Sequence, residues 1–397
     1  MIKSITLIGL GYVGLPTALL FARKKIHVQA VDINKKLIKD LKNKKSNIDE
    51  PDFINLFNNK SIDKYIKFYN VINFNTDAFI ICVPTPLNKK KKADLSFIKN
   101  AIFSVKPFLK KNDHIIIEST ISMDALNELH KILFDIIDLN INISYCPERV
   151  YPGNTINELI FNDRIIGLDD KKSKKVKKLY EIFVKGKIAL TDIRSAIMIK
   201  LLENTFRDNQ LAFANQVRLI CEEVKLDFNE IIQLANKHPR VNILNPGIGV
   251  GGHCIPVDPN FIFSFKKTTL FKESRALNES IPSYIHKKIS SYLNKRSIKK
   301  ISILGLSYKE NIGDFRESPA LKIFYKLNKN FDVKFYDPYF KNLLKINDNL
   351  KSSYLNHTKI LNYSNTIIIL TNHSIFKEFK FKYNHVIINP SINNFQF

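Results

Sequence analysis

The chain of 397 residues is long enough for two or three domains, each with a core of its own. Its 45% apolar and 25% charged residues are near the average of soluble proteins, and no apolar run reaches the roughly 18–20 residues of a membrane helix. The net charge of +25 is typical of polyanion binding, but ten of these charges form two lysine tracts, residues 89–92 and 171–178. No nucleic-acid-binding motif accompanies them, so we expect solvated lysine faces and neither a nucleic-acid nor a membrane partner.

The first predicted element is a strand, residues 4–8, that runs directly into a glycine motif. The basic region, apolar core and small-residue cleavage site of a signal peptide do not occur there. This segment therefore predicts a cytoplasmic protein.

Gly9, Gly11 and Gly14 form a G-x-G-x-x-G pattern, which alone is a weak signal. Here a strand precedes the pattern, a helix over residues 15–24 follows it, and the next strand ends in Asp32, 21 residues after Gly11. In that setting the first glycine makes the tight turn, the second lets the backbone approach a pyrophosphate, and the third lets the helix pack on the strand. We therefore predict a dinucleotide site.

The residues around the turn indicate which dinucleotide binds. Asp32 can accept hydrogen bonds from both ribose hydroxyls of NAD and would repel the 2′-phosphate of NADP. Tyr12 and Val13, between the second and third glycines, are assigned to the same NAD site. The alternative is a tight strand-to-helix turn that holds no ligand.

Short apolar strand candidates alternate with helical patterns up to about residue 190. They lie at residues 4–9, 27–33, 78–84, 114–120, 141–146 and 164–168. This alternation is typical of an α/β protein with a doubly wound parallel sheet, in which ligands lie at the carboxyl ends of the strands. Thr85 and Thr120 follow two of these strands, so their hydroxyls are candidate cofactor ligands; the alternative is that they cap the next helices.

The pattern from about residue 192 to 237 is helical, without glycine or proline. It predicts a long central helix followed by at least one more. Lys200 and Asn204 lie four residues apart on the long helix and so share one face. Taken singly, such side chains are ordinary exposed helix residues.

A glycine-dense loop, residues 246–259, contains Cys254 and, four residues later, Asp258. The free N–H groups of such a loop can hold an anion or a developing oxyanion, so Cys254 is a candidate nucleophile. The other cysteines are in apolar segments, without the spacing of a disulfide framework or a zinc site. We expect these three to be small buried side chains: Cys82, Cys146 and Cys221.

Strand patterns return at residue 299, after helices that extend to about residue 294. Apolar segments occur at residues 299–308, 332–337 and 366–372. They predict a second, smaller α/β domain.

Eight motifs occur in order along nearly the whole chain: GLGYVGLP, VPTP, EST, CPER, KLLENTFRD, HPRVNI, GVGGHCIPVDP and GLSYKENIGDFRESPAL. Together they resemble the UDP-glucose/UDP-N-acetylmannosamine dehydrogenase family. The resemblance implies two Rossmann-like parallel-sheet domains joined by a long central helical domain. The implied domains are an NAD-binding domain at residues 1–191, a dimerisation domain at residues 192–296 and a UDP-sugar-binding domain at residues 297–397. The implied partners are a UDP-sugar and further copies of the chain, in a homodimer or higher homo-oligomer.

The implied reaction is a four-electron oxidation in which a UDP-sugar, two NAD and water give the UDP-uronic acid. By resemblance, Cys254 captures the aldehyde as a thiohemiacetal that is oxidised to a thioester. Lys200 and Asn204 would hold the C6 oxygen. The residues that would position water or assist thioester hydrolysis are Asp258, Thr120 and Glu148. A Cys–His dyad with His253 is disfavoured, because adjacent side chains on an extended backbone point apart.

The resemblance also implies a set of substrate-binding residues, in which Arg240 would reach the substrate of a neighbouring subunit. The set is Arg149, Val150, Lys200, Asn204, Arg207, Arg240, Asn242, Gly251 and Lys309.

The motifs CPERVYPG and CIPVDP resemble the members that act on N-acetylated sugars more than the UDP-glucose enzymes, because Pro152 and Val257 replace charged residues. They predict oxidation of UDP-N-acetyl-D-mannosamine for cell-surface polysaccharide synthesis. UDP-N-acetylglucosamine is the alternative substrate, followed by UDP-glucose. Two departures, Glu310 for a proline and Gly313 for an aspartate, put a hydrogen-bond partner in the substrate cleft in doubt, but we expect an active enzyme.

Overall fold

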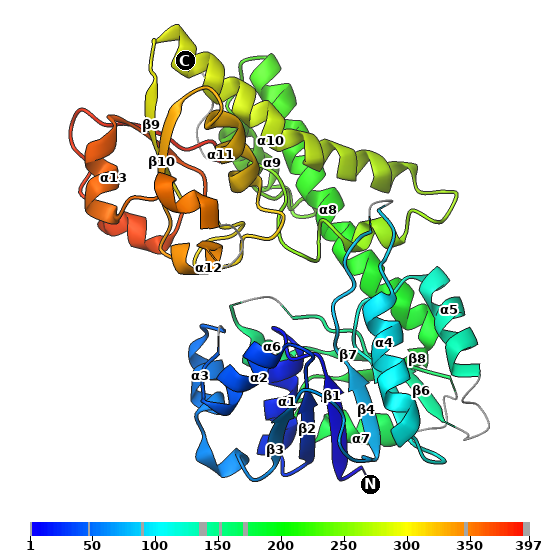
Figure 1. The fold of residues 1–397 in the computed structure, drawn as a ribbon. Helices are drawn as coiled ribbons and strands as arrows, with labels where there is room; N and C mark the ends of the chain where they lie inside the picture. The colour runs from blue at the N-terminus through cyan, green and yellow to red at the C-terminus, as the bar shows by residue number, and fades with distance from the viewer. Residues whose placement is uncertain are drawn as a thin grey trace. The chain divides into compact units, whose positions relative to one another are not determined.

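The computed structural model describes residues 2–46, 48–88, 91–134, 141–150, 153–169, 174–344 and 348–391. The chain divides into two compact units, Met1–Leu202 and Glu203–Phe397 (Figure 1). Pro152, which the sequence links to substrate choice, lies outside the described residues, as do four of the ten lysines of the two tracts: Lys89, Lys90, Lys171 and Lys172.

The first unit is built on an eight-stranded sheet with the order β3-β2-β1-β4-β5-β6-β7-β8. The strands are β1 (Ser4–Ile8), β2 (His27–Val31), β3 (Ile66–Tyr69), β4 (Ala78–Ile81), β5 (His114–Ile117), β6 (Asn142–Tyr145), β7 (Arg164–Leu168) and β8 (Ile188–Asp192). Neighbouring strands are parallel except β6 and β7, which are antiparallel. The predicted doubly wound sheet is confirmed, and the antiparallel pair is a feature that the strand pattern did not indicate.

Seven helices connect these strands in the described part of the first unit. They are α1 (Gly14–Arg23), α2 (Lys35–Lys42), α3 (Pro51–Phe57), α4 (Ser96–Val105), α5 (Met123–Phe134), α6 (Thr155–Phe161) and α7 (Lys175–Glu181). Nearly all of α1 is buried, from Gly14 to Ala22, because its apolar side chains pack into the core that β1, β2, α6 and α7 share. This burial fixes the first turn of α1 against the end of β1.

The second unit is built around long helices and a small sheet. Helix α8 (Ile193–Glu223) spans the boundary between the units, and α9 (Phe228–Ala235) and α10 (Thr269–Lys295) follow. The parallel sheet has the order β10-β9-β11-β12, with strands β9 (Lys300–Leu304), β10 (Asp332–Tyr336), β11 (Thr366–Ile369) and β12 (Val386–Ile388). Its remaining helices are α11 (Pro319–Leu327), α12 (Phe340–Leu344) and α13 (His357–Tyr363). The second predicted α/β domain is therefore confirmed.

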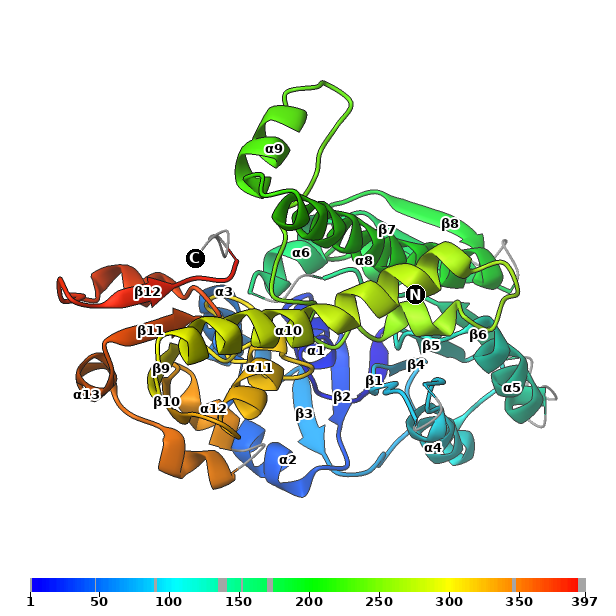
Figure 2. The same ribbon diagram turned by 90° about the horizontal axis from the view of Figure 1, so that it is seen from above.

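Helix α10 packs on the small sheet through one apolar face. Ile281, Ile285 and Ile289 recur every four residues on α10 and are buried with Ile303 of β9 and Phe324 of α11. Figure 2 shows α10 lying along α11 and this sheet. The packing makes α10 a rigid support for the loop that precedes it in the chain.

Both sheets use the same turn after their first strand. Gly9 and Gly305 have positive φ angles, +95° and +79°, and each donates its N–H to the last residue of the neighbouring strand at 2.9 Å. The N–H of the next residue is bound at 2.9 Å by the carboxylate that follows that strand, Asp32 in one sheet and Asp337 in the other. The second unit thus repeats the carboxylate-braced turn of the first.

No helix in the described part of the chain is long and apolar enough to cross a membrane.

His114, the first residue of β5, makes the stability of the first unit depend on pH. Its side chain is 3% exposed, and neither ring nitrogen has a hydrogen-bond partner among the described residues. Burial, helped by the charge of Lys175 and opposed by Asp77, lowers the pKa of His114 from 6.5 to about 4. Between these two values the unfolded chain binds a proton that the folded chain does not.

We therefore expect the free energy of unfolding to fall as the pH drops from about 6.5 to about 4, by roughly 3 kcal/mol at the acid end from this group alone. Urea unfolding at pH 7.5 and pH 5 measures the change. His114→Leu should reduce the loss between these two values, and His27→Gln, at an exposed histidine, should not. An equal loss in His114→Leu and the unaltered protein would contradict the assignment.

Candidate active site

The three glycines of the first turn have different steric surroundings. A Cβ at Gly9 would lie 2.6 Å from the carbonyl oxygen of Cys82, and one at Gly14 would lie 1.9 Å from the carbonyl oxygen of Gly9. A Cβ at Gly11 would have no atom within 4 Å. Gly9 and Gly14 are therefore required by the fold, whereas Gly11 leaves its backbone open to a ligand, as a pyrophosphate needs.

Asp32 is held at the end of β2 by two backbone groups. Its Oδ2 accepts from Leu10 N at 2.9 Å and its Oδ1 from Asn34 N at 2.8 Å. Each carboxylate oxygen keeps further acceptor capacity for a ribose hydroxyl. Tyr12 packs against the core, and the carbonyl of Val13 accepts from Thr17 N at 3.0 Å in the first turn of α1. These residues fit an NAD site at the carboxyl end of the sheet.

Thr85 and Thr120 lie in the loops after β4 and β5, and both are half-buried. Helix α4 begins only at Ser96, and near the start of α5 it is Ser122 whose Oγ accepts from Ala125 N at 3.2 Å. The alternative that these two threonines cap the next helices is therefore wrong. Their role as ligands stays a prediction.

A buried ionic cluster lies behind these loops. Glu118 Oε1 accepts from the hydroxyl of Tyr180 at 2.5 Å and from Arg164 at 3.3 Å, and its Oε2 accepts from the thiol of Cys82 at 3.2 Å. Burial and the neighbouring Glu118 raise the pKa of the Cys82 thiol well above its ordinary value. Cys82 is thus an unreactive hydrogen-bond donor, although the sequence predicted a purely apolar role.

The other two structural cysteines are buried as predicted. Burial raises the pKa of Cys146 to about 11, and Cys221 packs with Phe228 and Ile232. Neither has the environment of a reactive thiolate.

Lys200 and Glu148 meet in the first unit. Lys200 Nζ is 3.9 Å from Glu148 Oε2, and only 5% of the Lys200 side chain is exposed. Glu148 also accepts from the backbone N–H of Val150. Arg149 donates to the carbonyl oxygen of Asp163 at 2.7 Å, which fixes this segment beside β7. The structure therefore brings together two of the residues predicted for the chemistry.

Cys254, Asp258 and Asn204 meet in the second unit. The carbonyl oxygen of Cys254 accepts from Val257 N at 3.0 Å and from Asp258 N at 2.8 Å, which closes a single helical turn. Asn204 Nδ2 donates to Asp258 Oδ2 at 2.5 Å, so the turn is tied to α8. Asp258 is 3% exposed, whereas Cys254 is half-buried. The sulfur thus stays reachable while the acid beside it is enclosed.

The glycines before Cys254 allow close packing against the segment after β9. A Cβ at Gly251 would lie 2.6 Å from Cβ of Tyr308, and Gly252 has a φ of +91°. The N–H of Gly252 donates to the carbonyl oxygen of Arg316 at 3.0 Å. Lys309, which is half-buried, follows Tyr308 directly, so this packing brings its chain segment beside the cysteine loop.

His253 is directed toward an acid of the second unit. Its Nδ1 lies 3.9 Å from Asp314 Oδ2, and Arg316 Nη2 holds the same oxygen at 2.5 Å. Burial acts to raise the pKa of Asp314, but hydrogen bonds and the charge of Arg316 outweigh it and lower that pKa. This geometry favours a His253–Asp314 contact over a Cys–His dyad.

The departure at Gly313 has a steric reason. A Cβ there would lie 2.5 Å from Nδ2 of Asn342 and 3.0 Å from the ring of Tyr339, so any larger residue would require the Asn342 side chain to move. Glycine fits the present positions of these two side chains. Glu310, the other departure, is exposed.

Three predicted substrate residues are exposed and contact little in one copy of the chain. Arg207 Nη1 donates to Gln210 at 3.4 Å, and Arg240 and Asn242 lie in the segment after α9. Their role stays a prediction.

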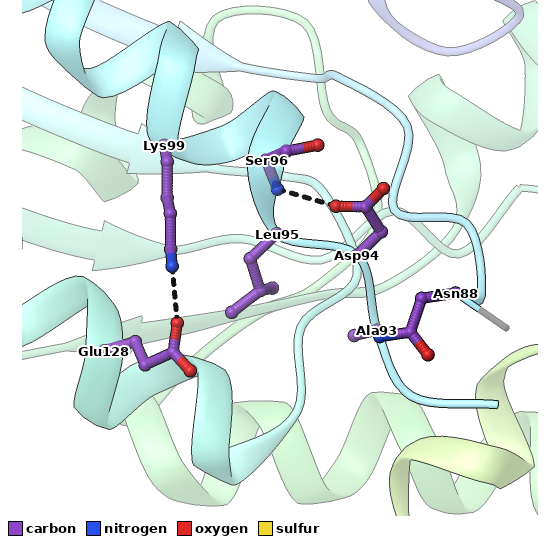
Figure 3. A pocket seen from close by; sticks show the side chains of 7 residues that line it. All are labelled: Asn88, Ala93, Asp94, Leu95, Ser96, Lys99 and Glu128. Carbon is purple, nitrogen blue, oxygen red and sulfur yellow. Dashed lines mark hydrogen bonds and ion pairs between the residues drawn. The ribbon is translucent and has the colours of Figure 1, made fainter. Parts of the chain in front are cut away.

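A surface hollow of about 300 Å³ lies at the start of α4 (Figure 3). It is lined by Asn88, Ala93, Asp94, Leu95, Ser96, Lys99 and Glu128. Its polar groups already pair with each other, because Lys99 binds Glu128 at 2.7 Å and Asp94 accepts from Ser96 N at 3.0 Å. None of the predicted site residues lines it, so we do not assign the reaction there.

The sequence patterns of a known family match this chain in three consecutive parts. They are the UDP-glucose/GDP-mannose dehydrogenase family NAD binding domain at residues 3–184, its central domain at 194–280 and its UDP binding domain at 302–392. The chain belongs to this dehydrogenase family. The predicted family, its NAD cofactor and its oxidoreductase class are confirmed.

Relatives of known name cover nearly the whole chain. A UDP-N-acetyl-D-mannosamine dehydrogenase of Methanocaldococcus jannaschii is 42% identical over 95% of this chain and 87% of its own length. An NDP-N-acetyl-D-galactosaminuronic acid dehydrogenase of Ralstonia nicotianae is 40% identical over 81% and 79%. The solved UDP-N-acetyl-mannosamine dehydrogenase of Staphylococcus aureus superposes with a TM-score of 0.86 at 34% identity, over 99% of each chain.

Sequence reasoning missed the polar side chains buried between α8 and α10 of this dehydrogenase. They are Asp208, Asn215, Arg275 and Asn278. Their spacing was the available signal. Asp208 and Asn215 are seven residues apart and Arg275 and Asn278 are three apart, and each interval places both side chains on one helix face. Apolar periodicity searches pass over such residues, since polar side chains are normally assigned to the exposed face.

The glycine turn gives a matched pair of variants. Gly14→Ala would place a methyl group 1.9 Å from a backbone oxygen, so α1 must shift; we expect a loss of about 2 kcal/mol or more and loss of NAD binding. Gly11→Ala meets no atom and should keep the melting temperature, but should weaken NAD at least about tenfold by blocking the backbone approach.

Thermal melting and calorimetric NAD titration measure the two effects separately; the chain has no tryptophan for a fluorescence assay. An unchanged melting temperature in Gly14→Ala, or unchanged NAD affinity in Gly11→Ala, would contradict the assigned roles.

Proposed function

We propose that this enzyme oxidises C6 of UDP-N-acetyl-D-mannosamine to the carboxylate, with Cys254 as the covalent nucleophile. The observation that carries the proposal is the turn that joins Cys254 and Asp258 and is bound to Asn204 of α8. The substrate follows from the names of relatives at 42% identity. The product would supply cell-surface polysaccharide synthesis.

The proposed reaction balances as one primary alcohol, two NAD⁺ and one water giving one carboxylate, two NADH and three protons. NAD, when bound, accepts one hydride in each of the two oxidations. After the first, the Cys254 sulfur adds to the aldehyde carbon, forming a C–S bond and an alkoxide that takes up a proton. The second oxidation removes the remaining hydride from that carbon and a proton from its oxygen, leaving a thioester. Water then attacks the thioester carbon, the C–S bond breaks, and the thiol is regenerated.

The proposal assigns the charge-stabilising roles to α8. Lys200 and Asn204, on successive turns of this helix, would donate to the C6 oxygen as negative charge develops there. Asp258 would hold the proton released from the attacking water. Thr120 and Glu148 would orient that water, and Glu148 is already held near Lys200 at 3.9 Å.

The binding roles stay as the resemblance implies them. NAD would be held by Gly9, Gly11, Tyr12, Val13, Gly14, Asp32, Thr85 and Thr120. The UDP-sugar would be held by Arg149, Val150, Lys200, Asn204, Arg207, Arg240, Asn242, Gly251 and Lys309. We propose domain boundaries of 1–191 for NAD binding, 192–296 for dimerisation and 297–397 for UDP-sugar binding.

We infer a cytoplasmic location for the enzyme. NAD and nucleotide sugars are cytoplasmic metabolites, and none of the four cysteines forms a disulfide within the described part of the chain, as expected in a reducing compartment.

Counting NADH against sugar tests the reaction. With UDP-N-acetyl-D-mannosamine we expect about two NADH per sugar consumed. Cys254→Ser should release at most about one and lower the rate of uronate formation by at least a hundredfold, on the order of the loss of other enzyme nucleophiles. Cys221→Ala, at a buried cysteine remote from the chemistry, should keep the ratio near two.

An unchanged uronate yield from Cys254→Ser would refute the covalent mechanism. The same assay with UDP-N-acetylglucosamine, UDP-N-acetylgalactosamine and UDP-glucose ranks the substrates. The relative named for an N-acetylgalactosaminuronic acid makes the galactose configuration a necessary comparison. A higher kcat/KM with any of these three would replace the proposed sugar.

We also propose that α8 forms the interface of a homodimer. Phe206, Phe213 and Ile220 recur every seven residues on α8, and Val224 comes directly after its last residue; each is 52–62% exposed. Such a stripe of large apolar side chains is the pattern of a helix that packs on a partner. A second copy would cover it and could bring its Arg240 to the substrate.

Phe213→Asp tests the dimer. We expect the unaltered enzyme to have twice the 46.0 kDa mass of one chain, and the variant to become monomeric, because each buried phenylalanine contributes about 1.5–3 kcal/mol. Light scattering after size exclusion measures the mass. Phe103→Asp, at a comparably exposed phenylalanine on α4, should stay dimeric. A monomeric parent enzyme, or a dimeric Phe213→Asp, would refute the interface.

A further inference from the structure

A layer of polar side chains is buried between α8 and α10. Asp208 and Asn215 come from α8, and Arg275 and Asn278 come from α10; all four are 3% exposed or less. Arg275 donates to Asp208 Oδ1 at 2.7 Å, and Asn278 Nδ2 donates to the same oxygen at 2.8 Å. Asn215 Nδ2 donates in turn to Asn278 Oδ1 at 2.9 Å. The four side chains thus form one continuous network.

Both ends of the network reach the loop that carries Cys254. Asn215 Oδ1 accepts from the backbone N–H of Gly247 at 3.0 Å. Arg275 Nη1, besides its bond to Asp208, lies 3.5 Å from the carbonyl oxygen of Ile255, directly after the cysteine. The loop is therefore held before and after Cys254 by side chains that are themselves fixed in the core.

The network continues the polar face of α8 that contains the proposed catalytic amide. Asn204, Asp208 and Asn215 are separated by four and seven residues, which places them on one side of the helix. Asn204 holds the loop at Asp258, and the network holds it at Gly247 and Ile255. The face of α8 thus binds the loop directly at Asp258 and Gly247, and through Asp208 it holds Arg275 of α10, which binds the loop at Ile255.

Stability alone does not explain a buried ion pair at this place. Desolvation of two charges cancels most of their attraction, and apolar side chains of similar volume often give equal or greater stability. Burial also raises the pKa of Asp208, against the opposing charge of Arg275. Apolar side chains, however, could not bind the N–H of Gly247 or the carbonyl of Ile255.

We propose that Asp208, Asn215, Arg275 and Asn278 are positioning residues that fix the loop of residues 247–255 and thereby set where the Cys254 sulfur stands. The effect on turnover rests on the proposed function, whereas the effect on the loop does not. A loosened loop misplaces the sulfur for attack on the aldehyde, whereas eight of the nine proposed substrate-binding residues, all except Gly251, lie outside the loop and would still hold the nucleotide sugar. The proposal therefore predicts a change in kcat rather than in KM.

The decisive variant is the double replacement Asp208→Leu with Arg275→Met. It replaces the ion pair by apolar side chains of similar size, so the melting temperature should stay equal or rise. We expect kcat with UDP-N-acetyl-D-mannosamine to fall at least about tenfold, with KM within about twofold. Alkylation of Cys254 by iodoacetamide, followed by peptide mass spectrometry, should become at least about fivefold faster, because the loop opens more often.

Asn215→Ala is the second variant, and it decides the question if the double replacement does not fold. It removes the bond to Gly247, so hydrogen exchange of that amide should accelerate at least about tenfold, with the same loss of kcat. Glu279→Gln is the matched control. Glu279 touches the outer side of Arg275 at 3.8 Å and is exposed, so its change should leave all readouts unaltered.

A folded double variant with parental kcat and parental alkylation rate would overturn the proposal, as would parental exchange at Gly247 together with parental kcat in Asn215→Ala. If the parent enzyme oxidises no UDP-hexose, the proposed function fails. The alkylation and exchange rates then still test the positioning of the loop, since they need no substrate.

Discussion

The bond between Asn204 of α8 and Asp258 is the contact on which the candidate chemistry depends. At 2.5 Å it joins the turn that follows the loop glycines to α8, a helix of 31 residues. A glycine-dense loop has high conformational entropy and would not by itself hold a sulfur in one place. Fixing its end to α8, and closing the Cys254–Asp258 turn by backbone bonds, turns a flexible segment into a defined one.

The turn after the first strand of each sheet also combines a glycine that allows the backbone to turn with a carboxylate that holds the turn in place. Gly9 and Gly305 make turns that a side chain would block, and Asp32 and Asp337 then brace the turns by accepting N–H groups. The glycines allow the positive φ angles that these turns need, and the carboxylates fix the turns by hydrogen bonds to the backbone. Several of the 12 glycines thus lie where a Cβ would meet backbone or ring atoms, as at Gly14 and Gly251, whereas Gly11 leaves its backbone open.

Local patterns in the sequence were enough to predict the two α/β domains, the long helix and the dinucleotide turn, because each of these features depends on residues that are close together in the sequence. The edge strands β3, β8 and β12 were missed. Each has at most one buried residue, so none shows a continuous apolar run. At the site, the loop motif identified Cys254 and Asp258. The partners of the loop could not be found in this way, because Asn215 and Arg275 contact it across 32 and 20 residues.

The buried network between α8 and α10 differs in kind from the apolar packing beside it. Contacts such as those of Ile281 and Ile285 with the small sheet stabilise the second unit without orienting a loop. Polar side chains are enclosed where backbone groups of a loop must be bound at fixed points, which apolar contacts cannot do. The apolar face of α10 contributes stability, and its polar face, with Arg275 and Asn278, fixes the position of the cysteine loop. A substitution on one face should therefore have little effect on the role of the other.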